Sequence, residues 1–154
     1  MEYGNIEREF HVDASPEVVF DVISNPIHVR QWWGADSDFE ATPGHSGELV
    51  WGSEEAPRQH VTPFTVVDAE PPRLFSFRWA YADTAAATLA NSLLVTFELA
   101  PSGAGTTVRL TESGFREMGW EAALLEHNYN DHVQGWTTYL AALAEYAAGV
   151  VASR

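Results

Sequence analysis

The fold of this chain depends on one stretch near its C-terminus, GWEAALLEHNYNDHVQGWTTYLAALAEYAA, from Gly119 to Ala148. Apolar and aromatic side chains recur in it at spacings of three and four, which is the period of one helix face. About thirty residues at 1.5 Å each make a helix of about 45 Å, and Gly149 is placed to end it. We therefore predict a long final helix whose inward stripe comprises Leu125, Asn128, Tyr129, His132, Trp136, Tyr139, Leu140, Leu143 and Ala147.

The middle of the chain alternates apolar and polar residues between clusters of turn-forming residues. Alternation at period two predicts antiparallel strands with one apolar and one solvated face. Phe75, Phe77 and Trp79, for example, share the apolar face of one strand. A curved sheet of about six or seven strands is expected. Its clearest members are Ile6–Val12, Gly47–Trp51, Val61–Ala69, Leu74–Trp79, Ser92–Leu99 and Thr106–Thr111.

Two short helices are predicted directly after the first strand. Ser15-Pro16-Glu17 combines a capping hydroxyl, a proline at the first helical position and an acidic first turn. Asn25-Pro26 repeats the cap and the proline, so a second helix is expected to run towards Trp32. The whole chain, residues 1–154, is thus predicted to be one α+β domain.

Composition excludes several classes of function. The chain has 22 acidic residues against 8 basic ones, a formal charge of -14, so nucleic acids and anionic membranes would be repelled. Cysteine and lysine are absent, which excludes thiol nucleophiles, disulfides, thiolate metal sites and Schiff bases. The N-terminus has no secretory-signal pattern and no apolar stretch is long enough to span a bilayer, so a cytoplasmic location is expected.

Four charged residues are expected on the solvated side of the sheet. Arg78, Glu98, Arg109 and Glu112 lie on or near the polar faces of adjacent predicted strands, where they can pair as a charged ladder. If the polar side were concave instead, the same four would be pocket residues with acid–base potential. Within the final helix, Gly135 costs about 1 kcal/mol relative to alanine, so it is expected to mark a bend or a close contact.

The order of these elements resembles the helix-grip fold of the START-like, pollen-allergen-like superfamily called SRPBCC. Within it, the sequence is most similar to the family that resembles the C-terminal domain of the activator of the heat-shock-protein-90 ATPase. The resemblance implies a sheet and a long final helix that together enclose a cavity. The segments that carry it are DASPEVVF (13–20), QWWG (31–34), VDAEPPRL (67–74), ESGF (112–115) and GWTTYLAAL (135–143).

We predict that a small hydrophobic or aromatic molecule binds in that cavity, oriented by His132 and Asn128. The candidate pocket residues are His132, Asn128, Trp136, Trp51, Phe77, Trp79 and Tyr129. No metal site is expected, because His127 and His132 are about 140° apart around a helix, and no cofactor motif is present.

Two alternatives stay open beside this prediction. One is a co-chaperone-like interaction protein, whose partners would be a chaperone or a second copy of the chain. The other is a cyclase- or hydrolase-type enzyme that uses the same cavity. Binding without catalysis is favoured over an enzyme because no known nucleophile motif is present.

Overall fold

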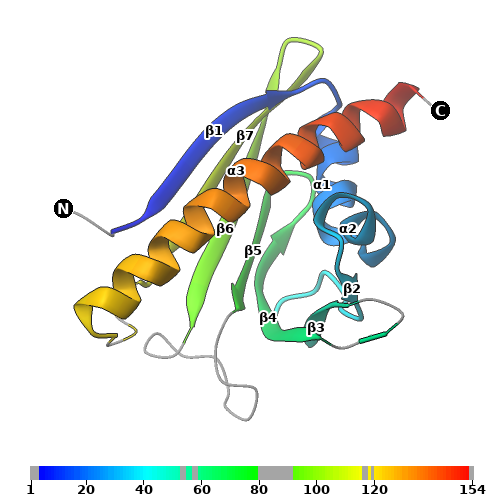
Figure 1. Ribbon diagram of the computed structural model, residues 1–154. Helices are drawn as coiled ribbons and strands as arrows, with labels where there is room; N and C mark the ends of the chain where they lie inside the picture. Colours follow the sequence, from blue (N-terminus) through cyan, green and yellow to red (C-terminus); the bar gives the residue numbers. More distant parts are fainter. Residues whose placement is uncertain are drawn as a thin grey trace.

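The computed structural model in Figure 1 describes residues 4–52, 55–56, 59–79, 92–115, 118 and 120–152. It has the predicted α+β order, with one strand, two short helices, a run of strands and a long final helix. The elements are β1 (Ile6–Val12), α1 (Pro16–Ser24), α2 (Pro26–Trp33), β2 (Asp36–Ser37), β3 (Ser46–Trp51), β4 (His60–Glu70), β5 (Leu74–Trp79), β6 (Leu93–Ser102), β7 (Gly105–Ser113) and α3 (Ala122–Ala152).

The seven strands of the described residues form one antiparallel sheet. Their order is β1-β7-β6-β5-β4-β3-β2, so the first strand of the chain pairs with the last one, Phe10 opposite Val108. Figure 1 shows α3 lying across one face of the curved sheet, with α1 and α2 near its C-terminal end. This arrangement confirms the predicted helix-grip fold.

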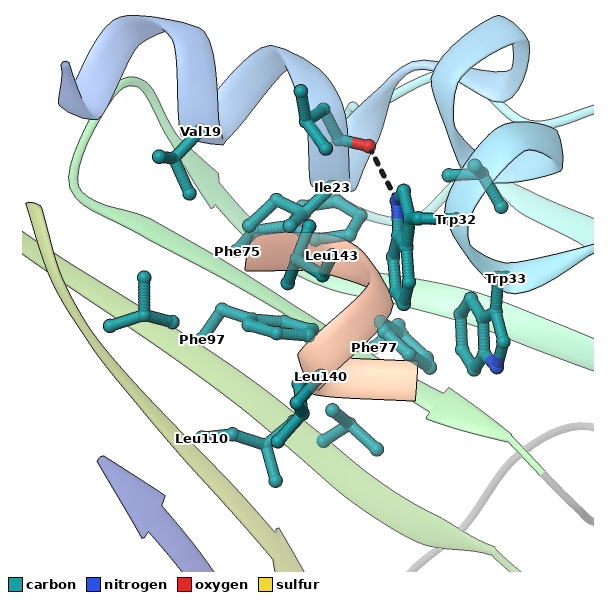
Figure 2. Packing of buried hydrophobic residues seen from close by; sticks show 14 of the residues in the cluster. Val19, Ile23, Trp32, Trp33, Phe75, Phe77, Phe97, Leu110, Leu140 and Leu143 are labelled. Carbon is teal, nitrogen blue, oxygen red and sulfur yellow. Dashed lines mark hydrogen bonds between the residues drawn. The ribbon is translucent and has the colours of Figure 1, made fainter. Parts of the chain in front are cut away.

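The core fills the space between the sheet and the helices. In β6, Leu93, Val95, Phe97 and Leu99 are buried, whereas Glu98 between them is exposed, as the alternation predicted. Figure 2 shows aromatic rings of β5 and β6 packed beneath side chains from all three helices, among them Ile23, Trp32 and Leu143.

Hydrogen bonds fix the two short helices at their ends. The hydroxyl of Ser15 accepts from the backbone N–H of Val18, and the side-chain oxygen of Asn25 accepts from that of Ile27 at 3.1 Å. Asn25 also ends α1, because its backbone N–H donates to the carbonyl of Asp21. Trp32 Nε1 donates to the carbonyl of Val22, which ties α2 to α1 (Figure 2).

The structure differs from the sequence-based expectations at both ends of α3, in the added strand β2 and in strand lengths, since β6 runs to Ser102 and β7 to Ser113. α3 continues past Gly149 to Ala152, because Val150 beyond it still packs against the core. The described helix starts at Ala122, and Gly119 lies outside the described residues. Strand β2 was not predicted, because two residues are too few to show an alternating pattern.

Asn25→Ala is expected to destabilise the protein by about 1 kcal/mol, because the first backbone N–H groups of α2 lose their cap. Asn25→Ser keeps a capping oxygen and is expected to stay close to the parent. Urea unfolding followed by tryptophan fluorescence measures both variants. Equal loss of stability in the two variants would show that the cap does not contribute.

Candidate ligand-binding site

A cavity of about 570 Å³ lies between α3, the end of α2 and strands β3 to β5. This volume falls within the range of pockets that hold small molecules, roughly 300 to 1,000 Å³. α3 contributes residues at spacings of one, three and four, so the cavity lies under one face of that helix. The lining residues are Trp33, Trp51, Val61, Thr62, Pro63, Trp79, Asn128, Asp131, His132, Gly135, Trp136 and Tyr139.

Trp33 is the centre of an aromatic wall. Its ring centroid lies 5.2 Å from that of Trp79, 5.6 Å from that of Trp136 and 6.0 Å from that of Trp51. The position of Trp33 is set locally, because Gly34 adopts a left-handed backbone with φ of 76° and ends α2 at this point. Trp51 Nε1 also donates to the carbonyl of Trp33 at 3.1 Å. The cavity is therefore walled by aromatic rings that other elements hold in place.

Gly135 opens the helix side of the cavity. A Cβ atom added there would meet no atom within 4 Å, apart from the neighbouring backbone of its own helix. Of the two expectations for Gly135, a bend or a close contact, the close contact is not found among the described residues. Since glycine lowers helix stability by about 1 kcal/mol relative to alanine, this position keeps free space at a cost in stability.

Glu112 is a fully buried acid beside the cavity, with an exposed fraction of 0%. Its Oε2 accepts a hydrogen bond from Trp79 Nε1 at 2.7 Å, and its Oε1 accepts one from Trp136 Nε1 at 2.8 Å. A third bond joins Oε1 to His132 Nδ1 at 2.8 Å. The carboxylate thus exchanges its water shell for three N–H donors, which makes burial of the charge tolerable.

The placement of Glu112 corrects the expectation of a solvated ladder. Alternation along β7 puts Glu112 on the same face as Val108 and Leu110, which are both buried, so it points towards α3. The ladder holds only in part: Glu98 lies opposite Arg109, whose guanidinium is 3.5 Å from a carboxylate oxygen of Glu7. Arg78 Nη1 donates to the hydroxyl of Ser92 at 3.3 Å.

His132 links this buried acid to the cavity. Because a carboxylate only accepts hydrogen bonds, Nδ1 of His132 is assigned as the N–H donor to Glu112. The imidazole is held edge-on between the rings of Trp79 and Phe115, each with its centroid 5.5 Å away. Among the described residues Nε2 has no hydrogen-bond partner, so this nitrogen is available for a further hydrogen bond.

The pKa of His132 lies above its ordinary value of 6.5. Burial alone would lower the pKa, because it penalises the charged imidazolium. The hydrogen bond and the charge of Glu112, together with the charge of Asp131, raise it by more. The surroundings of His132 therefore favour its protonated form more than water does.

Asn128 lies one helical turn before His132 on the same face of α3. Its side chain is half-buried and lines the cavity, and within the described part of the chain its amide has no hydrogen-bond partner. Buried and half-buried amides are usually bonded to protein or to water. Asn128 and His132 thus present unused hydrogen-bonding groups to the same space.

Residues 13–148 match the family described as "Activator of Hsp90 ATPase homolog 1-like protein". The chain belongs to this family. The match extends from the loop before α1 almost to the end of α3, so it includes every residue of the cavity wall. Comparison with curated protein sequences returned no match.

Solved structures of bacterial proteins share the fold of this family member at low sequence identity. Protein MLL2253 from Mesorhizobium loti is 20% identical, with a TM-score of 0.72 over 92% of this chain and 94% of that one. Protein NE0264 from Nitrosomonas europaea is 13% identical, with a TM-score of 0.74 over 96% of each chain. The Aha1 dimer from Colwellia psychrerythraea, a solution structure, is 18% identical, with a TM-score of 0.65 over 92% of this chain and 94% of that one.

Two features are absent from the described residues of this family member. They contain no group of three or more histidine, aspartate or glutamate side chains arranged to hold a metal ion. None of their helices combines the length and the apolarity needed to cross a bilayer.

The structure brings most of the predicted pocket residues of this family member together. The cavity is lined by His132, Asn128, Trp136, Trp51 and Trp79. Phe77 lies behind this wall, buried against Trp33 and Trp79. Tyr129 faces away from it, with its ring against Phe115 and its hydroxyl donating to the carbonyl of Asn5.

The sequence did not predict Trp33 at the site, and it predicted Glu112 as a pocket residue only if the polar side of the sheet were concave. Trp33 had a signal, since it stands in the QWWG segment that carries the family resemblance, but nothing local showed that its ring faces the cavity. The sequence also contained a signal for the burial of Glu112, because this residue continues the alternation of Val108 and Leu110. Its charge favoured the opposite face, and only the three donors explain why it is buried.

The stabilising effect of His132 is expected to decrease as pH rises. Because its folded pKa is raised above the unfolded value, its protonation stabilises the folded state fully below about pH 6.5, and this contribution is lost as pH rises through the folded pKa. The difference in free energy of unfolding between the parent and His132→Gln should therefore shrink from pH 6 to pH 9, as measured by urea unfolding.

A matched control is His127→Gln, which removes an exposed histidine from the same helix. Because the side chain of His127 is exposed, this substitution is expected to change the free energy of unfolding little. A difference for His132→Gln that is constant, or that grows with pH, would contradict the assigned interaction with Glu112.

Proposed function

We propose that this protein binds a small, largely apolar aromatic molecule in the cavity beneath α3. The observation that carries the proposal is the combination of an open space of about 570 Å³, four tryptophan side chains in its walls and two polar groups without hydrogen-bond partners among the described residues. Pockets for small molecules are built in this way, from apolar walls and a few orienting polar groups.

The walls supply the affinity in this proposal. Burial of apolar surface contributes about 25 cal/mol per Å², so a bicyclic ring enclosed on several sides gains several kcal/mol before the costs of association. The half-buried rings of Trp51 and Trp79 line the cavity beside the buried rings of Trp33 and Trp136, and aromatic surface favours planar aromatic ligands over flexible aliphatic ones. The rings are already packed against one another, so little ordering is required on binding.

The polar pair supplies the selectivity. Asn128 can donate and accept, while Nε2 of His132 accepts when the imidazole is neutral and donates when it is protonated. A ligand with one hydroxyl or carbonyl group would satisfy one of these groups. A pure hydrocarbon would leave both without partners and would bind less well.

A second candidate function is binding of another protein, either a chaperone or a second copy of this chain. It is supported by the family description, which names an activator of the Hsp90 ATPase, and by the dimeric Colwellia relative. The two candidates differ in what they predict. Analytical ultracentrifugation would show concentration-dependent dimers for the second, and small aromatic molecules would have no effect on it.

We expect 2-naphthol to quench the intrinsic fluorescence saturably, because four of the six tryptophans line the cavity. Gly135→Leu should weaken this binding by about tenfold or more, equivalent to about 1.4 kcal/mol, because the new side chain occupies the opening. Fluorescence titration and a thermal-shift assay with the same compound measure the effect.

Gly149→Leu is the matched control, because Gly149 lies in the same helix, is exposed, and also has free space around an added Cβ. Both substitutions remove a helical glycine and are expected to raise stability without ligand. Only Gly135→Leu should lose binding. Equal binding by both variants, or no saturable quenching by the parent, would contradict the proposed site.

A further inference from the structure

Glu112 and His132 have the geometry of a general base, the histidine, that is oriented by a carboxylate. The carboxylate fixes the imidazole through a 2.8 Å bond to Nδ1, and it is itself fixed by Trp79 and Trp136. In neutral His132 this bond selects the tautomer with hydrogen on Nδ1, so the lone pair is on Nε2. A base oriented by a buried carboxylate in this way can take a proton from a molecule in the cavity.

The surroundings of the pair narrow the type of reaction. The described residues that line the cavity include neither serine nor cysteine, and no described hydrogen bond joins the hydroxyl groups of Thr62 or Tyr139 to His132, so the pair has no nucleophile in position to activate. What remains is proton transfer to and from the ligand itself. The cavity walls are largely aromatic, and a neutral substrate would enter such a cavity more readily than a charged one.

We propose that His132 and Glu112 act as a general base on an enolisable carbonyl compound bound in the cavity. This inference rests on the ligand site proposed above. Neutral Nε2 removes a proton from the carbon next to the carbonyl group. The C–H electron pair becomes the new C=C bond, and the carbonyl π pair moves to oxygen. Nε2–H then returns the proton to carbon or oxygen, so no co-reactant is consumed.

Asn128 is placed to assist at the carbonyl oxygen. It lies four residues before His132, a rise of about 6 Å along α3, on the same side of the helix. An amide N–H at that distance from the base can donate to the oxygen while the base acts on the neighbouring carbon. Donors aimed at a developing oxyanion stabilise the transition state more than the substrate.

The reaction should become faster as pH rises, because only neutral His132 is a base. The charged groups that face it are Glu112 from β7 and Asp131 from α3, and both favour the protonated form. Its other neighbours, Trp79 and Phe115, are not charged near neutral pH. A raised pKa makes Nε2 a stronger base once it is deprotonated.

The test uses 2-tetralone, a neutral bicyclic ketone with acidic C–H bonds, in D₂O. Loss of the C1 proton signal in NMR reports deuterium exchange, and tryptophan quenching reports binding. The parent should accelerate exchange about a hundredfold over His132→Gln, with a rate that increases with pD. Asn128→Ala should lower the rate, and His127→Gln, on the exposed side of α3, should leave it unchanged.

A role for Glu112 in positioning the base has its own readout. Glu112→Gln keeps the shape and an acceptor oxygen but removes the charge, so the midpoint of the rate–pD profile should move to lower pD. An unchanged midpoint in a folded variant would contradict this role. If Glu112→Gln fails to fold, the comparison of His132→Gln with the parent still decides the proposal.

The outcomes separate this inference from the proposed function. Quenching by 2-tetralone with equal exchange in the parent and His132→Gln overturns the general-base role and leaves the binding site standing. Exchange that depends on His132 supports both. If 2-tetralone causes no quenching and the parent catalyses no exchange, both the binding site and the general-base role are contradicted. The reason is that 2-tetralone belongs to the proposed ligand class and to the proposed substrate class.

Discussion

The structure depends on how one buried carboxylate is satisfied. Glu112 is completely enclosed, and removing a charged group from water is tolerable only when other groups replace its hydration. Its three donors come from β5 and from two turns of α3, so the same hydrogen bonds that stabilise the charge also fix the helix on the sheet. When one partner of a buried charge pair is removed, stability typically falls by about 3 to 5 kcal/mol.

These hydrogen bonds also shape the cavity. Trp79, Trp136 and His132 each turn a nitrogen towards Glu112, which leaves the remainder of each ring as cavity wall. These hydrogen bonds therefore fix the orientation of the three rings. Gly135 on the same helix keeps the cavity open because it has no side chain. A side chain there would enter the space that the rings enclose. The same arrangement of side chains thus stabilises the buried charge and shapes the cavity.

The sequence predicted the fold well because several local signals agree. Ser15 and Asn25 have the caps that their positions indicated, and the alternation in β6 identified the buried face. Asn128, His132 and Trp136 were predictable from helical spacing, whereas Tyr129 on the same stripe packs against Phe115 instead. Glu112 was not, because a charge on an alternating strand normally faces water, and its burial depends on donors far away in the sequence. Trp33 likewise depends on how α2 packs against distant strands.

The hydrogen bond between Glu112 and His132 is tested most directly by ¹⁵N NMR. This measurement reports the protonation state of each ring nitrogen of His132 as pH is raised. The account predicts that Nδ1 keeps its hydrogen throughout, held by Glu112, while Nε2 loses its hydrogen at a pH above 6.5. A neutral form that carries its hydrogen on Nε2 would contradict it, because Nδ1 could then not donate to the carboxylate.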